Sequence, residues 1–372
     1  MRVVHVYRTY FPDPPGGLQE AIRQICLGTQ VYGVEARVFT LSPKPEPSVV
    51  ERNEAQVVRS RSWAAPASCD LGGLDAWVKF NKLLAWADVV HYHFPWPFGD
   101  FLRLTSLSHK PSVLTYHSDV VRQKALGYAY APLMRKMLNA MSFVVATSPA
   151  YAQTSPVLTK HVPPNRLRVI PLGIADFADQ SLPGDFTDRW GLDEPFLLAL
   201  GVLRYYKGLD TLLTAAKDIQ GKVVIAGSGP EETALKNQAA ALGLNNVVFA
   251  GQVSVEEKIY LLRSCRALVL PSHLRSEAFG MVLVEASMFA KPMVSCELGT
   301  GTSYVNAHDE TGFVVRPENP RMLAEVCNRL LMDDNLAHCF GLSARKRYET
   351  LFSGKATGKS YFDLYQQSLV SR

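Results

Sequence analysis

The chain has 372 residues, of which 47% are hydrophobic and 20% charged, as is ordinary for a globular protein. This length predicts two domains. No apolar run approaches the roughly 18 to 20 residues that span a bilayer, and the N-terminal segment VVHVY is too short for the core of a signal peptide. The six cysteines have no C-x-x-C spacing, so we expect reduced core residues and neither a zinc site nor a disulfide framework.

The net charge of +5 is distributed unevenly. Residues 1–170 hold 19 Lys and Arg against 11 Asp and Glu, a net charge of +8, whereas the remainder carries −3. A basic first half indicates an anionic partner such as a membrane surface, a diphosphate lipid or nucleic acid, although ordinary solvated surface charge explains it equally well. No Lys/Arg-rich block or nucleic-acid motif occurs, so nucleic acid is not expected.

Short β-branched runs alternate with helical stretches along the whole chain. Strands are expected at residues 2–7, 35–41, 88–93, 111–117, 142–148, 195–201, 221–227, 245–251, 266–272 and 292–296, and the first helix at 18–32. Such alternation predicts parallel, doubly wound sheets. About ten strands are too many for one compact unit, so we predict two α/β domains, residues 1–172 and 173–350, with the boundary near 169–174. Residues 351–372 are expected to form a helix that packs back on the first domain.

The segment RSEAFGMVLVEAS, residues 275–287, contains two glutamates in otherwise apolar surroundings. Glu277 follows a predicted buried strand, and Glu285 lies on a predicted helix over 280–290. The strand-to-helix edge of an open α/β sheet is where ligands bind, and the amides of Gly280 and Met281 would form an anion site at the helix start. Carboxylates on both sides of that site accept hydrogen bonds from hydroxyls, which fits a nucleotide-sugar. The alternative is that one glutamate simply faces solvent.

Six motifs in the same order resemble the retaining glycosyltransferases of family 4 over nearly the whole length. They are PPGGLQE (14–20), TYHSD (115–119), GVLRYYKGLD (201–210), IAGSGPEE (225–232), SEAFGMVLVE (276–285) and ETGFVV (310–315). The resemblance implies the GT-B fold, two Rossmann-like domains facing across a cleft. The G-x-G of the fourth motif lacks a third glycine, so a dinucleotide-dependent oxidoreductase is disfavoured.

The resemblance also implies roles for individual residues. Gly16 and Gly17 would lie against the donor diphosphate, and His117 would contact the transferred sugar. Arg204 and Lys207, expected at a helix N-terminus, would bind the diphosphate; relatives commonly carry Arg where Val202 stands, so Arg204 would have to replace it. Further donor contacts are expected from Glu277 (sugar), Glu285 (ribose), Phe279, Gly280 and Met281 (amides), and Val253 with Lys258 (base).

His91 and His93 would face the same side of a strand, as a metal pair does. No third ligand is evident from the sequence, so we interpret them as cleft or packing residues, and the aromatic-proline run after them as shaping the acceptor side. No D-x-D motif occurs, so we expect no metal and no cofactor, with leaving-group charge stabilised by Arg204, Lys207 and the helix N-terminus.

The resemblance is greatest to bacterial O-polysaccharide mannosyl- and rhamnosyltransferases, which use GDP-sugars and a polyprenyl-diphosphate-linked saccharide. It implies a cytoplasmic enzyme on the inner face of the cytoplasmic membrane, to which a basic first domain is suited. Three alternatives stay open: a UDP-sugar-dependent transferase, a GT-B sugar-nucleotide epimerase, and a non-catalytic nucleotide-sugar-binding subunit.

Overall fold

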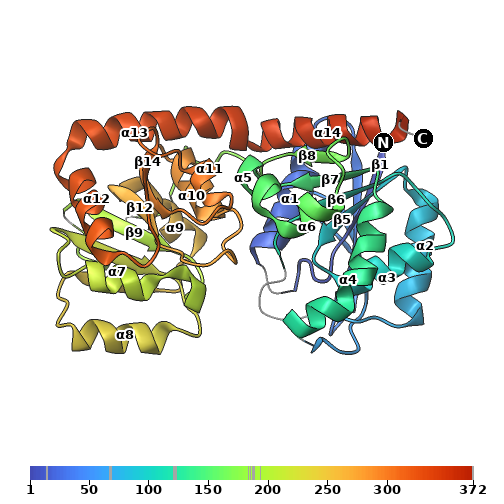
Figure 1. The fold of residues 1–372 in the computed structure, drawn as a ribbon, viewed down its shortest axis with the longest axis horizontal. Helices are drawn as coiled ribbons and strands as arrows, with labels where there is room; N and C mark the ends of the chain where they lie inside the picture. Colours follow the sequence, from blue (N-terminus) through green and yellow to red (C-terminus); the bar gives the residue numbers. More distant parts are fainter. Residues whose placement is uncertain are drawn as a thin grey trace. The chain divides into compact units, whose positions relative to one another are not determined.

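The computed structural model describes residues 1–13, 16–66, 69–119, 124–182, 184, 186, 189–192 and 194–370 (Figure 1). Its contacts divide the chain into two compact units. Unit 1 comprises Met1–Ala175 and Ser353–Arg372, and unit 2 comprises Asp176–Phe352. These divisions lie within three residues of the predicted boundaries at 172/173 and 350/351. Several residues between 183 and 193, after the predicted boundary, and Pro14 and Pro15 of the first motif lie outside the described residues.

Unit 1 is built on an eight-stranded sheet of order β3-β4-β2-β1-β5-β6-β7-β8. All pairings are parallel except the β3–β4 pair at one edge. Its strands are β1 (Arg2–Val6), β2 (Glu35–Ser42), β3 (Val49–Glu51), β4 (Gln56–Arg61), β5 (Val89–Phe94), β6 (Ser112–Tyr116), β7 (Phe143–Ala146) and β8 (Leu167–Val169). Its helices are α1 (Gly17–Gln30), α2 (Leu74–Trp86), α3 (Pro97–Thr105), α4 (Lys124–Asn139), α5 (Pro149–Thr154), α6 (Pro156–His161) and α14 (Gly354–Val370).

Unit 2 has a fully parallel six-stranded sheet of order β11-β10-β9-β12-β13-β14. Its strands are β9 (Phe196–Leu200), β10 (Lys222–Ala226), β11 (Val247–Gly251), β12 (Ala267–Leu270), β13 (Met293–Cys296) and β14 (Gly312–Val315). The 3₁₀ turn η3 (Tyr205–Lys207) precedes α7 (Leu209–Ala215), followed by α8 (Glu232–Ala241), α9 (Val255–Ser264), α10 (Met281–Met288), α11 (Thr302–Val305), α12 (Pro320–Met332), α13 (Asp334–Arg347) and the π-helical turn η4 (Tyr348–Phe352).

The predicted doubly wound α/β class is confirmed in both units. Each sheet reverses its strand order once, between β1 and β5 in unit 1 and between β9 and β12 in unit 2. The loops at the carboxyl ends of these strand pairs part to opposite faces of the sheet and leave a crevice, which is where such folds bind ligands. The two reversals therefore indicate where functional residues belong in each unit.

Helix α14 belongs to unit 1 although unit 2 separates it in sequence from the rest of that unit. It crosses α1 where Gly28 meets Gly358, so closely that a Cβ on Gly358 would lie 2.1 Å from the Gly28 carbonyl oxygen. The buried rings of Tyr361 and Tyr365 then pack beneath β1, β5 and β6 with Val3, Val89 and Val113. The C-terminal helix thus completes the core of the N-terminal sheet.

Candidate functional site

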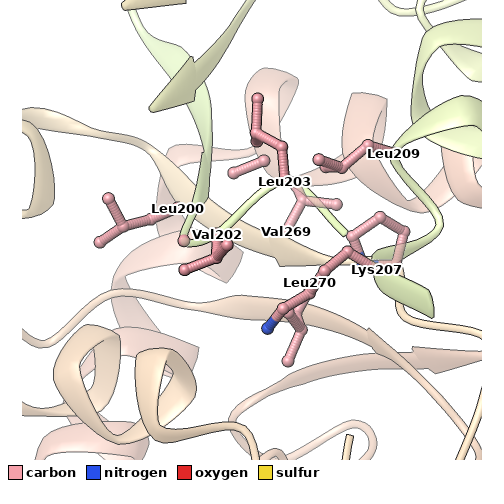
Figure 2. A pocket seen from close by; sticks show the side chains of 10 residues that line it. Leu200, Val202, Leu203, Lys207, Leu209, Val269 and Leu270 are labelled. Atoms are coloured by element: carbon pink, nitrogen blue, oxygen red, sulfur yellow. The ribbon is translucent and has the colours of Figure 1, made fainter. Parts of the chain in front are cut away.

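A small recess opens in unit 2 at the carboxyl ends of β9 and β12, the two strands at the order reversal (Figure 2). Its lining residues include Leu200, Val202, Leu203, Lys207, Leu209, Val269 and Leu270. The wall is apolar apart from Lys207, whose ammonium lies within 4.0 Å of where a Cβ on Gly201 would stand. The topology thus places the predicted lysine at the ligand-binding edge of this sheet.

Glycines bring the loops after β9 and β10 together. A Cβ on Gly227 would lie 2.0 Å from the Gly201 carbonyl oxygen, and one on Gly229 would lie 2.4 Å from that of Leu203. Backbone hydrogen bonds join the same loops, with Leu203 N–H donating to Ser228 (3.0 Å) and Glu231 N–H to Leu203 (3.2 Å). The G-x-G of the fourth motif therefore has a packing role, because any side chain there would separate the two loops.

Lys207 and Glu277 form an ion pair, with 2.5 Å between Nζ and Oε2, and both side chains are largely buried. The Ser272 hydroxyl donates to the same carboxylate oxygen at 3.1 Å. Burial lowers the pKa of Lys207, but the attraction of the Glu277 carboxylate outweighs it and the pKa is raised, so the lysine is charged. Ser272, two residues after the end of β12, was not among the predicted residues. Its place just past a strand end next to the site is the signal that identifies it.

Arg204 lies just before the 3₁₀ turn η3, and α7 begins only at Leu209, after Gly208 in a left-handed conformation. The prediction that Arg204 and Lys207 sit at the helix N-terminus is therefore corrected: an extra turn separates Arg204 from it. Arg204 is exposed, and its guanidinium has no ion-pair or hydrogen-bond partner among the described residues. Its cationic group is thus available to an incoming anion.

Helix α10 starts at Met281 with Gly280 as its N-cap, and no side chain caps it. Gly280 has φ 79°, which only glycine adopts readily, and a Cβ there would lie 3.0 Å from the side chains of Leu270 and Leu283. Phe279, the residue before Gly280, is buried in the core. The first amides of an uncapped helix have no intrahelical partner and attract anions.

Glu285 on the second turn of α10 pairs with Lys258 on the first turn of α9, with 2.7 Å between Oε1 and Nζ. Val253, half-buried, immediately precedes Ser254, the N-cap of α9, whose capping box with Glu257 holds that helix start rigid. The structure therefore gathers Val253, Lys258 and Glu285 at neighbouring helix starts. Both predicted carboxylates, Glu277 and Glu285, have a lysine partner.

In unit 1, Gly16 and Gly17 form the start of α1, which no side chain caps. Both residues are exposed, and a Cβ on Gly17 would meet no atom within 4 Å. Among the described residues space is therefore open at Gly17, whereas a Cβ on Gly16 would lie 2.7 Å from Oε1 of Gln19. This helix start follows β1 at the order reversal. This arrangement fits the predicted approach of a ligand to the backbone.

His117 follows β6 directly and is buried. Its Nε2 lies 3.0 Å from Nδ1 of His93, and His93 Nε2 lies 3.1 Å from Nδ1 of His5. The expectation that no third ligand accompanies His91 and His93 is wrong, because His5, His91 and His93 place ring nitrogens within 4.8 Å of one another. Sequence reasoning missed His5 because it lies on β1, and only the register of β1 with β5 brings it opposite His91.

His91 takes part in the hydrogen bonds that hold α14 against the sheet of unit 1. Its Nδ1 is 2.8 Å from the Tyr365 hydroxyl and its Nε2 is 2.7 Å from the Thr115 hydroxyl, which in turn meets the Tyr361 hydroxyl at 2.9 Å. Both of its nitrogens are therefore engaged, as in a packing residue. In the aromatic-proline run, Phe94, Trp96 and Phe98 are likewise buried, so these rings form core of unit 1.

Comparison with protein families gives two matches that together cover most of the chain. Residues 15–176 match the family model "Glycosyltransferase Family 4", and residues 186–347 match "Glycosyl transferases group 1". The D-rhamnosyltransferase WbpZ of Pseudomonas aeruginosa is 43% identical over 95% of this chain and 92% of its own. The O-antigen chain mannosyltransferase C of Escherichia coli is 38% identical over 100% of both.

Solved structures share the fold at low sequence identity. Sucrose-phosphate synthase from Thermosynechococcus elongatus has a TM-score of 0.82 at 22% identity and full coverage of both chains. Anabaena Alr3699/HepE in complex with UDP has a TM-score of 0.80 at 18% identity, covering 99% of this chain and 100% of its own. The two α/β units thus have the GT-B architecture.

Proposed function

Because this chain belongs to the family 4 glycosyltransferases, we propose that it transfers mannose or rhamnose from a GDP-sugar to a lipid-diphosphate-linked saccharide of an O-antigen. Two relatives aligned over more than nine-tenths of their length, a D-rhamnosyltransferase and an O-antigen chain mannosyltransferase, support the sugar and the pathway. The observation that carries the donor chemistry is the pairing of Glu277 with Lys207 and of Glu285 with Lys258 on either side of the uncapped start of α10.

Each group at this edge of unit 2 has a task in the proposal. The amides of Phe279, Gly280 and Met281 with Lys207 and Arg204 hold the diphosphate and stabilise the charge that develops on it as the sugar leaves. Glu285 accepts hydrogen bonds from the ribose, and Lys258 turns that carboxylate toward it. Glu277 accepts from hydroxyls of the sugar, and Val253 packs against the base.

The residues of unit 1 complete the proposal. Gly16 and Gly17 leave room for the donor over the start of α1, and His117 contacts the transferred sugar. Burial lowers the pKa of His117 to about 3, so its ring is neutral at physiological pH and attracts no phosphate by charge. We further propose retention of the anomeric configuration by front-face attack, in which the leaving phosphate oxygen accepts the proton of the acceptor hydroxyl, without a metal.

The test is calorimetric titration of the full chain with GDP, UDP and ADP in the presence of a chelator. We expect GDP to bind and UDP and ADP to bind far more weakly, with Glu285→Ala weakening GDP by about tenfold or more, since each lost hydrogen bond to a charged group contributes roughly 1.5–3 kcal/mol. UDP preference would overturn the GDP-sugar donor. Turnover of GDP-mannose without an acceptor would identify an epimerase instead, and binding without transfer to lipid-linked acceptor would identify a non-catalytic subunit.

A further inference from the structure

Three buried histidines of unit 1 form a continuous chain of hydrogen bonds that ends at His117. His5 Nδ1 and His93 Nε2 are 3.1 Å apart, and His93 Nδ1 and His117 Nε2 are 3.0 Å apart. The three side chains are 0, 2 and 6% exposed. Both distances are those of direct N–H···N hydrogen bonds.

The sheet topology produces this alignment. β1, β5 and β6 are consecutive neighbours, with His5 opposite His91 and His93 opposite Thr115. Side chains two residues apart share a face of a strand, so His93 and His117 both lie on the face that carries His5. The chain runs from the covered part of the sheet to its carboxyl edge, where ligands bind in such folds.

The direction of the hydrogen bonds follows from protonation and burial. Burial lowers the pKa of His5 and His117 to about 3 and that of His93 well below its usual value, so all three rings are neutral. A neutral imidazole has one donor and one acceptor nitrogen, so the chain must run in one direction or the other.

His5 decides between the two directions. Its Nε2 is buried and has no hydrogen-bond partner in the described part of the chain. If the bonds ran from His117 toward His5, this atom would be a buried N–H without an acceptor, the type of orphan group that folded proteins rarely contain. If the bonds run from His5 toward His117, His5 Nε2 carries only an unused lone pair. Burying an unused lone pair is less unfavourable than burying an N–H without an acceptor.

We propose that His5 and His93 are positioning residues that hold His117 in the tautomer with its proton on Nδ1. His117 Nε2 then accepts from His93, and its Nδ1, for which no described residue is a hydrogen-bond partner, presents an N–H donor to a hydroxyl oxygen of the sugar. This assignment rests on the proposed contact of His117 with the transferred sugar. It makes His117 a hydrogen-bond donor that orients the substrate, and excludes it as a general base at Nδ1.

A metal at His5, His91 and His93 is the competing explanation of the cluster. Against it, both nitrogens of His91 bond to Thr115 and Tyr365, and the facing nitrogens of His5 and His93 bond to each other. A metal would have to break these bonds. The hydrogen-bonded chain accounts for the same nitrogens without breaking any.

The tautomers are read directly by long-range ¹H–¹⁵N correlation spectra of the histidine rings in the full chain without substrate, assigned with single histidine variants. We expect Nδ1 protonated and Nε2 unprotonated in His93 and His117, unchanged between pH 6 and pH 8. Protonated Nε2 in His117 would overturn the proposal, as would stoichiometric metal in the purified chain whose removal shifts the His93 signals.

Two substitutions at His93 separate positioning from packing. In His93→Asn the side-chain NH₂ replaces Nδ1 and keeps a donor to His117, whereas in His93→Gln the amide lies near the place of Nε2 and that donor is lost. We expect His93→Gln to lower kcat by about 10- to 100-fold, as loss of an orienting hydrogen bond does, and His93→Asn to restore most of it, with similar urea midpoints for both. Equal loss in both variants would overturn the proposal. If His117→Ala leaves transfer unchanged, the proposed role of His117 fails, but the spectra still test the hydrogen-bonded chain.

Discussion

At the scale of single residues, the ion pair between Lys207 and Glu277 is expected to affect both the stability of unit 2 and its proposed activity. Replacing Lys207 by Met leaves the largely buried Glu277 carboxylate with only the Ser272 hydroxyl as a described side-chain partner. If Lys207 has the proposed role, we expect Lys207→Met to weaken GDP binding and to lower kcat by about 10²- to 10³-fold, because the cation proposed to hold the leaving diphosphate is lost. Calorimetry and initial rates measure the two effects.

The double variant Lys207→Met/Glu277→Gln distinguishes this role from a purely structural one. Removing both charges eliminates the uncompensated buried carboxylate, so we expect the thermal midpoint lost in Lys207→Met to be largely regained. Activity should stay low, because neither the diphosphate nor the sugar contact returns. Recovery of activity together with stability would contradict the assigned role.

Asp100 on α3 provides a pH-dependent contribution to the stability of unit 1. Burial raises the pKa of its carboxyl group to about 8, although the hydrogen bond from Tyr130 opposes the shift. A folded pKa above the unfolded value means that the folded state binds the proton more tightly, so this stability is complete below about pH 4 and is lost as the pH rises toward 8.

The measurement is urea denaturation of the full chain at pH 5 to 8 beside Asp100→Asn, which is neutral at every pH. We expect the free energy of unfolding of the unaltered chain to fall relative to Asp100→Asn by up to about 1.4 kcal/mol per pH unit over this range. Parallel pH profiles for the two chains would show that the carboxyl group is ionised in the folded state.

At the scale of elements, the crossing of α1 and α14 depends on two glycines. A Cβ on Gly358 would lie 2.1 Å from the carbonyl oxygen of Gly28, and backbone cannot move aside as a flexible side chain does. We expect Gly358→Ala to destabilise the chain by about 1–3 kcal/mol, the usual cost of overpacking. Gly17→Ala, at the start of the other helix α1, is the control, because its Cβ would meet no atom within 4 Å. Equal destabilisation by both would contradict this packing argument.

The strands of the structure can be compared with those that the sequence predicts. Ten strands were expected from apolar runs, and all ten are present, with each end within two residues of the predicted one. β3, β4, β8 and β14 were missed. β4 contains the buried Arg59, whose Nη2 bonds to Asp13, Ser42 and the Lys44 carbonyl, all more than ten residues away. No local pattern reveals such long-range pairing.

For the candidate site, the sequence likewise predicts some residues but not the residues they contact. Spacing and motif order predict Glu277, Glu285, Lys207 and His117 as site residues, because the two glutamates follow a buried strand, the lysine precedes a helix and the histidine ends a strand. Their partners were not predictable: Lys207 is 70 residues from Glu277, and His5 reaches His93 across 88 residues. Strand order and register determine these contacts, and both depend on the whole sheet.

At the scale of the whole molecule, unit 1 contains both residues 1–170, with their net charge of +8, and several exposed apolar side chains. Trp63, Leu74, Phe101 and Leu107 are 66, 76, 47 and 78% exposed. They lie on or beside α2 and α3, which are joined by hydrogen bonds from Trp77 Nε1 to the Thr105 carbonyl and from the Leu107 N–H to the Asn81 side chain. Among the described residues no helix is long and apolar enough to cross a membrane.

Such a surface predicts reversible binding to anionic vesicles, because apolar side chains enter the interface while basic residues are drawn to the lipid head groups. We expect the full chain to sediment with phosphatidylglycerol vesicles at low salt and much less at high salt. Leu74→Asp/Leu107→Asp should reduce the bound fraction by about tenfold or more, since it exchanges two apolar contacts for two repelled charges. Leu342→Asp, at a similarly exposed leucine of unit 2, is the matched control; if it reduces binding as much as the double variant, the surface that meets the membrane does not lie on α2 and α3.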